Sequence, residues 1–79
     1  MTNWRDHIHS DPGILGGKPV VKGTRISVEL ILEYLADGCS VADVVASYPQ
    51  ISEAAVRAAL AFAHDMVADE APIARQRAA

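Results

Sequence analysis

Three cations and three glycines gather in one short segment of this 79-residue chain. Lys18, Lys22 and Arg25 fall within eight residues, and beside them lie Gly16, Gly17 and Gly23. Glycine lets a backbone approach a phosphate closely, and lysine and arginine supply the opposite charge. The segment is therefore a candidate site for binding a nucleic-acid backbone. Alternatively, the glycines serve only turns and the cations are solvated. It is not a P-loop, because the spacing differs and no Ser or Thr follows Lys18.

A second candidate surface is the start of the last expected helix, Ser52–Val67. Its polar residues are Ser52, Glu53 and Arg57. In a helix-turn-helix motif, this part of the last helix meets base edges in the major groove. Arg57 is the strong donor, whereas Glu53 repels phosphate and could accept a hydrogen bond only from a cytosine amino group. The same pattern also fits a plain three-helix bundle that binds no DNA.

Metal binding and catalysis find weaker support in the sequence. His7, His9 and Asp11 alternate, so on a strand they would face one side and could ligate a metal. Capping and surface hydrogen bonds explain them more simply, because no distant fourth ligand is apparent. We therefore predict no metal site and no cofactor.

The chain offers no paired carboxylates in a cleft and no Ser-His-Asp set. The sequence therefore predicts a binding protein and not an enzyme.

Three amphipathic helices are expected to carry these residues. Ser27, Ser40 and Ser52 are good N-caps, and Gly38 and Pro49 end the first two helices. In the third helix we expect an inner stripe and an opposite, more polar side. The inner stripe is Val56, Ala59, Leu60, Ala63 and Val67, and the polar side is Arg57, Ala61 and His64.

The N-terminal third is predicted to contain a tight hairpin. Two short β-branched runs, residues 19–21 and 24–26, flank the pair Lys22-Gly23. The expected fold is therefore mainly α: a three-helix, helix-turn-helix or winged-helix-like (homeodomain-like) core with a short N-terminal β-hairpin. We divide the chain into an N-terminal arm (1–7), the helix-turn-helix-like domain (8–70) and a flexible C-terminal tail (71–79).

Composition limits the partners. The net charge of −3 argues against strong non-specific DNA binding, which needs a basic face. A core this small is thin, so a partner chain, such as a second copy in a homodimer, would add burial. One cysteine, Cys39, together with the lack of a leader-like or membrane-length apolar run, predicts a cytoplasmic protein with no membrane contact.

One long motif resembles a known family. From His9 to Ile26 the chain runs His-Ser-Asp-Pro-Gly-Ile-Leu-Gly-Gly-Lys-Pro-Val-Val-Lys-Gly-Thr-Arg-Ile. Gly38-Cys-Ser, Tyr48-Pro-Gln-Ile-Ser and Val56-Arg-Ala-Ala-Leu-Ala-Phe-Ala follow. The pattern resembles, from about Ile8 to Val67, a widespread prokaryotic family catalogued as a domain of unknown function (number 433). Its members look like antitoxins of VapB type, often encoded beside PIN-like ribonuclease toxins.

The resemblance implies a winged-helix or homeodomain-like fold, a dimer and two partners, a PIN-like toxin and operator DNA. The residues expected to contact DNA would be Lys18, Lys22, Arg25, Ser52 and Arg57. In the tail, Arg75 and Arg77 would enter the carboxylate-rich site of the toxin and pair with it. Alternatively, the acidic stretch Asp65, Asp69 and Glu70 would cover the toxin's basic RNA path. A protein-interaction module that never binds DNA is the other interpretation that stays open.

Overall fold

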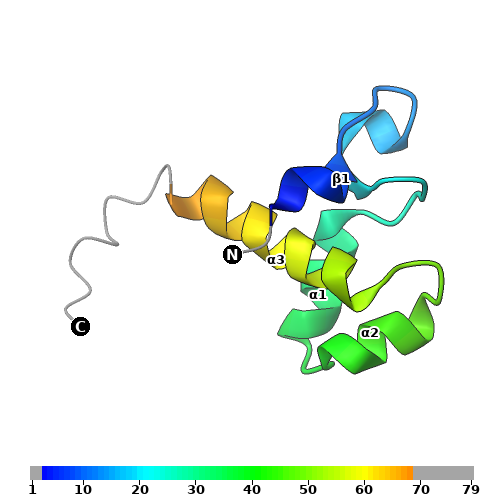
Figure 1. Cartoon of the computed structure of the whole chain (residues 1–79), viewed down its shortest axis with the longest axis vertical. Coiled ribbons are helices and arrows are strands. Elements are labelled where there is room, and N and C mark those ends of the chain that lie inside the picture. The colour runs from blue at the N-terminus through cyan, green and yellow to red at the C-terminus, as the bar shows by residue number, and fades with distance from the viewer. Residues whose placement is uncertain (1–2, 69–79) are drawn as a thin grey trace.

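The computed structural model describes residues 3–68 and is mainly helical (Figure 1). In chain order the elements are η1 (Trp4–Asp6), β1 (Ile8–His9), η2 (Leu15–Gly17), β2 (Val20–Val21), α1 (Val28–Ala36), α2 (Val41–Ser47) and α3 (Glu53–Ala68). Within residues 3–68, three α-helices and a small two-stranded antiparallel sheet near the N-terminus make up the fold. The predicted mainly α class with three helices is confirmed.

Each α-helix begins at the serine predicted to cap it. The hydroxyl oxygens of Ser27, Ser40 and Ser52 each accept a hydrogen bond of 3.0 Å from the backbone N–H three residues later. At α2 the carboxylate of Asp43 also accepts from the backbone N–H of Ser40 at 2.8 Å, which completes a capping box. After α1, Gly38 has φ +103°, a conformation that favours glycine at a helix end.

The capping box of α2 gives a first prediction. We expect Ser40→Ala to lower the free energy of unfolding by about 1 kcal/mol, because the backbone N–H of Asp43 loses its acceptor. Urea unfolding followed by circular dichroism measures this change. Ser47→Ala, at an exposed serine near the end of the same helix, is the control and should change it by less than about 0.5 kcal/mol. Equal losses in the two variants would contradict a capping role.

The sheet pairs segments that the sequence did not link. β1 is antiparallel to β2, with Ile8 opposite Val21 and His9 opposite Val20. The predicted turn does form, since the N–H of Thr24 donates to the carbonyl of Val21 at 3.0 Å. Beyond that turn, an antiparallel bridge pairs Val20 with Ser27. Two backbone hydrogen bonds of 2.9 Å accompany it, from the N–H of Val21 to the carbonyl of Ile26 and from the N–H of Val28 to the carbonyl of Pro19. The predicted hairpin is therefore present only as this turn and bridge, and the strand that pairs with β2 is β1, which was not predicted because a run of two residues is too short to show a periodic pattern.

Helix α3 is the central element of the domain. It contacts α1, α2, η1 and β1, and Figure 1 shows it running through the middle of the molecule. Its buried residues are Ala55, Val56, Ala58, Ala59 and Ala61. These small side chains let neighbouring elements approach its backbone closely from several directions.

The inner stripe predicted for α3 needs correction. Ala61, expected on the polar side, is buried, whereas Leu60 and Val67, expected inside, are exposed. A helix contacted on several sides does not bury one stripe, so the helical period alone selects the wrong residues. The largest fully buried side chains of the domain are Ile31, Val20, Val44 and Val56. Among the described residues, no helix combines the length and apolar character needed to cross a membrane.

Candidate functional site

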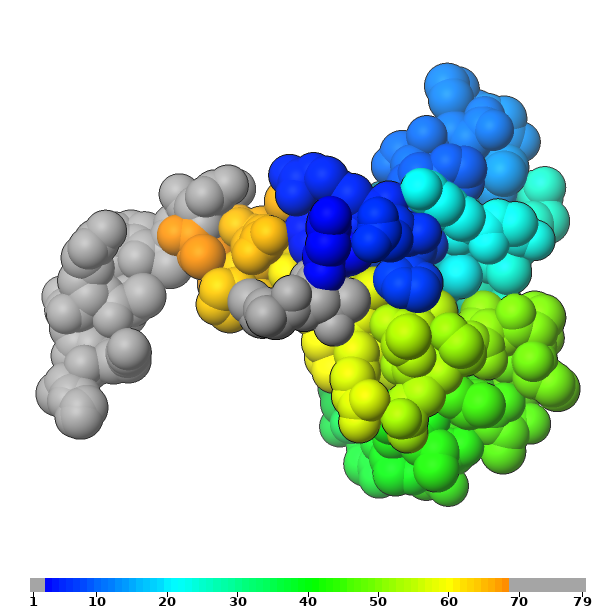
Figure 2. All heavy atoms as spheres, viewed as in Figure 1, coloured from blue at the N-terminus to red at the C-terminus, as the bar shows by residue number. Residues whose placement is uncertain are grey.

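The motif-bearing segment forms one end of the molecule. A loop of residues 10–19, here called the connecting loop, joins β1 to β2, and a turn of residues 21–24 follows. In Figure 2 the connecting loop projects from the body at the upper right, with the cyan segment around β2 directly beneath it. The connecting loop therefore carries Gly16, Gly17 and Lys18, the turn carries Lys22 and Gly23, and Arg25 directly follows the turn.

The tip of the connecting loop holds a strained leucine. Leu15, Gly16 and Gly17 have φ angles of +49°, +67° and +91°. The left-handed region costs a residue with a side chain roughly 1 kcal/mol or more, and a bulky residue is seldom found there. Leu15 is 40% exposed and does not belong to the buried core cluster.

The glycines of this loop serve turns. The N–H of Gly17 donates to the carbonyl of Ile14 at 3.0 Å, and the N–H of Lys18 donates to the carbonyl of Leu15 at 3.3 Å. These two groups are therefore engaged within the loop and are not presented to a phosphate. This agrees with the alternative in which the glycines shape the backbone.

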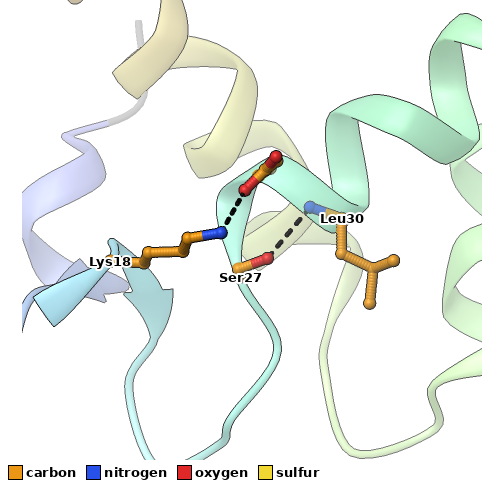
Figure 3. Close-up of polar contacts among 4 residues, drawn as sticks. Lys18, Ser27 and Leu30 are labelled. Carbon is orange, nitrogen blue, oxygen red and sulfur yellow. Dashed lines mark hydrogen bonds and ion pairs between the residues drawn. The ribbon is translucent and has the colours of Figure 1, made fainter. Parts of the chain in front are cut away.

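Lys18 reaches the first turn of α1. Its Nζ lies 2.8 Å from Oε1 of Glu29, and both side chains are largely exposed (Figure 3). The hydrogen bond from Lys18, followed by its positive charge, lowers the pKa of Glu29. Figure 3 also shows the neighbouring cap, in which the hydroxyl of Ser27 accepts from the N–H of Leu30. One of the three clustered cations expected to face phosphate is thus already paired with a carboxylate.

An open, mainly apolar pocket of about 310 Å³ lies beside this ion pair. The residues that line it come from the connecting loop, α1 and α3. They are Lys18, Pro19, Val28, Glu29, Leu32 and Phe62. Its size is at the low end of small-ligand sites, and it is large enough for an apolar side chain of a partner.

The remaining candidate DNA-binding residues divide into two kinds. Lys22 and Arg25 are exposed, and within residues 3–68 neither forms an ion pair. Arg57 pairs with Glu53 on the same helix at 3.0 Å, and the hydroxyl of Ser52 serves as the cap of α3. The cluster of Lys18, Lys22 and Arg25 therefore lies on the loop segments, whereas Arg57 and Glu53 lie on α3. Arg75, Arg77, Asp69 and Glu70 lie outside the described residues.

The three residues weighed as metal ligands do not converge. Oδ1 of Asp11 accepts from the backbone N–H of Gly13 at 2.8 Å. His9 points its Nε2 into the protein, where this atom is buried without a hydrogen-bond partner. In the part of the chain that the structure describes, no three His, Cys, Asp or Glu side chains are grouped to hold a metal ion.

The unpartnered nitrogen of His9 gives a second prediction. We expect His9→Leu to stabilise the domain by about 1 kcal/mol, because an unsatisfied buried polar atom is removed. Thermal unfolding should show a higher melting temperature. His7→Leu removes no atom of this kind among the described residues and serves as the control. A lower melting temperature for His9→Leu would show that its nitrogen has a partner in solution.

Trp4 anchors the N-terminal arm on α3. Trp4 packs edge-on against Phe62 of α3, with ring centroids 4.8 Å apart. Its Nε1 donates to Oδ2 of Asp65 at 2.9 Å, and the guanidinium of Arg5 lies 4.4 Å from the ring centre. The hydrogen bond from Trp4, then that from His64, lowers the pKa of Asp65.

Leu15 was missed altogether as a functional candidate. The feature that could have identified it from the sequence is the position of a large apolar residue directly before Gly16-Gly17, in a segment rich in turn residues. Exposed large apolar side chains also occur along α3, at Leu60, Met66 and Val67.

Comparison with known proteins gives a family and one relative. A family model described as "Protein of unknown function (DUF433)" matches residues 8–63. An uncharacterized protein, y4eO of Sinorhizobium fredii (strain NBRC 101917 / NGR234), is 37% identical over 59 residues. These residues are 75% of this chain and 27% of the relative, so the chain spans about a quarter of that relative's length. No solved structure matches the chain.

Proposed function

Since this chain belongs to the DUF433 family, we propose that it is an antitoxin-like regulator whose main ligand is another protein, a PIN-like ribonuclease toxin. The observation that carries this proposal is the exposure of large apolar side chains at both ends of the fold. Leu15 lies on the connecting loop, and Leu60, Met66 and Val67 lie on α3. Leu60 and Val67 are seven residues apart and share one face of α3, and contiguous exposed apolar surface is typical of sites that bind proteins. In this proposal the chain acts in the cytoplasm as a homodimer and catalyses no reaction.

The charges of the described residues favour a protein over DNA as the main ligand. Of the cations expected to contact phosphate, Lys18 and Arg57 already have carboxylate partners. Lys22 and Arg25 remain, on a chain of net charge −3. Two phosphate contacts per chain support only weak electrostatic binding.

Operator DNA is the second candidate ligand, and the exposed, unpaired Lys22 and Arg25 favour it. In this alternative, α2 and α3 with the short joint of residues 48–52 act as a helix-turn-helix. The first turn of α3 would then meet base edges, and the turn at residues 21–24 would act as a wing on the backbone.

Co-expression with the adjacent gene tests the main proposal. The two products should co-elute as a complex whose mass, measured by light scattering, exceeds that of either chain alone. If the neighbour arrests growth, this chain should restore it. An Arg75→Ala, Arg77→Ala double variant that still restores growth fully would exclude the tail mechanism. Separate elution of the two chains would contradict the proposal.

Salt dependence distinguishes the two ligands and is a third prediction. We expect any binding to the chain's own promoter region to weaken with salt with a slope of log K against log [salt] of about −2 per chain, since about two phosphates are contacted. Mobility-shift assays at several salt concentrations measure the slope, and a Lys22→Gln, Arg25→Gln variant should abolish it. A slope near zero would support the interaction module, and a much steeper slope would show that Lys18 and Arg57 leave their carboxylates.

A further inference from the structure

We propose that the connecting loop is a docking element for an acidic protein surface, with Leu15 as an apolar anchor and Lys22 and Arg25 as its charged flank. The partner surface would offer an apolar pocket bordered by carboxylates. This inference rests on the proposed function, because it names the part of the chain that the protein partner contacts.

Leu15 is the first reason. A leucine at φ +49° is strained, and 40% of the surface of this residue is exposed and available to a partner. Strained backbone is commonly retained where the residue has a role in binding. Gly16 and Gly17 continue the left-handed backbone, so three consecutive residues of the connecting loop have positive φ angles.

Charge is the second reason. β2 is only two residues long, so the turn carrying Lys22 begins about 7 Å along the chain from the end of the connecting loop. The carboxylates nearest in sequence to this end are engaged. The carboxylate of Asp11 accepts a hydrogen bond from the N–H of Gly13, and the carboxylate of Glu29 forms an ion pair with Lys18. Asp11 keeps its negative charge in this hydrogen bond, so residues 10–29 carry three cations against two carboxylates and keep a small excess of positive charge. A complementary surface is apolar with negative charge.

The same details favour a protein over a nucleic acid on this loop. The N–H groups of Gly17 and Lys18 are engaged in turns, so the backbone offers neither of them to a phosphate. An exposed leucine at the tip gains nothing from a solvated phosphate, whereas it fills a pocket in a protein surface.

The experiment measures the affinity of full-length variants for the product of the adjacent gene. Leu15→Gly removes the anchor and suits the left-handed backbone, so its melting temperature should equal or exceed that of the unsubstituted chain. Its affinity should fall at least about tenfold. Ser47→Ala is the control, since this exposed serine lies on α2, which carries none of the apolar side chains named in the proposed function, and its affinity should change less than about twofold.

The charged flank is tested in the same assay. Lys22→Gln with Arg25→Gln should weaken binding at low salt, and the difference should shrink as salt rises. Arg57→Gln, at a cation already paired with Glu53, is the control and should bind like the unsubstituted chain.

The outcomes separate the two proposals. If the unsubstituted chain binds the neighbour and Leu15→Gly binds equally well, the docking loop is wrong and the proposed function stands. If the unsubstituted chain does not bind the neighbour, both proposals fail. If the loop variants lose affinity for promoter DNA and keep their affinity for the protein, the loop serves nucleic acid and this inference is overturned.

Discussion

We expect Ile31→Ala to lower the free energy of unfolding of this domain by about 3 kcal/mol, the largest effect of any single change considered. Ile31 has no exposed surface and belongs to the same buried cluster as Val44 of α2 and Val56 of α3. Truncation removes three carbons and leaves a cavity between the helices. A chain of this size has a total stability of only about 4–12 kcal/mol, so the variant should lose roughly a quarter to three quarters of it.

Urea unfolding of the purified chain measures this effect. Leu60→Ala is the control, because it truncates a comparable aliphatic side chain at an exposed position on α3. It should cost less than about 1 kcal/mol. Similar losses in the two variants would mean that Leu60 is covered in solution, as it would be in a dimer, and concentration dependence of the melting temperature would then reveal it.

The second large effect is expected at Trp4. We expect Trp4→Ala to cost about 2 kcal/mol, below the range for a fully buried tryptophan because this ring is only half-buried. The variant loses the contact with Phe62 and the hydrogen bond to Asp65, which together fix η1 on the second half of α3. Thermal unfolding by circular dichroism measures the loss.

Trp4→Phe separates the two contributions, since it keeps an aromatic ring against Phe62 and removes the N–H. Its stability should fall between those of Trp4→Ala and the unsubstituted chain. The pKa of Asp65 is lowered by folding, so the stability that it contributes is complete above its ordinary pKa of 3.8 and is lost as pH falls through the lower folded value. Because the Trp4 hydrogen bond is the main cause, Trp4→Phe should lose less stability on acidification. Identical acid titrations of the two proteins would contradict this assignment.

The helices were predictable because their signals are local. Ser27, Ser40 and Ser52 each act on an N–H three residues away, and Gly38 acts on the turn in which it lies. Such contacts can be found from spacing alone, and all three starts are confirmed.

The interior and the site were less predictable because they depend on tertiary contacts. The pairing of Ile8 with Val21 and the ion pair of Lys18 with Glu29 join residues whose separation follows no helical or strand period. The burial of Ala61 depends on α3 lying between several elements. The strain of Leu15 could not be read from residue types, since Gly16-Gly17 indicates a turn and does not place the residue before it in the left-handed region.

The alanines of α3 have a consequence for redesign of this scaffold. At Ala55, Ala58, Ala59 and Ala61, neighbouring elements pack almost directly on the helix backbone, so even one added methyl group per site would push them apart. Natural variants at these positions should be confined to the smallest amino acids. An engineer seeking new binding specificities should leave these alanines unchanged. The connecting loop is the better place for variation, because its length and residues can change without altering the packing on α3.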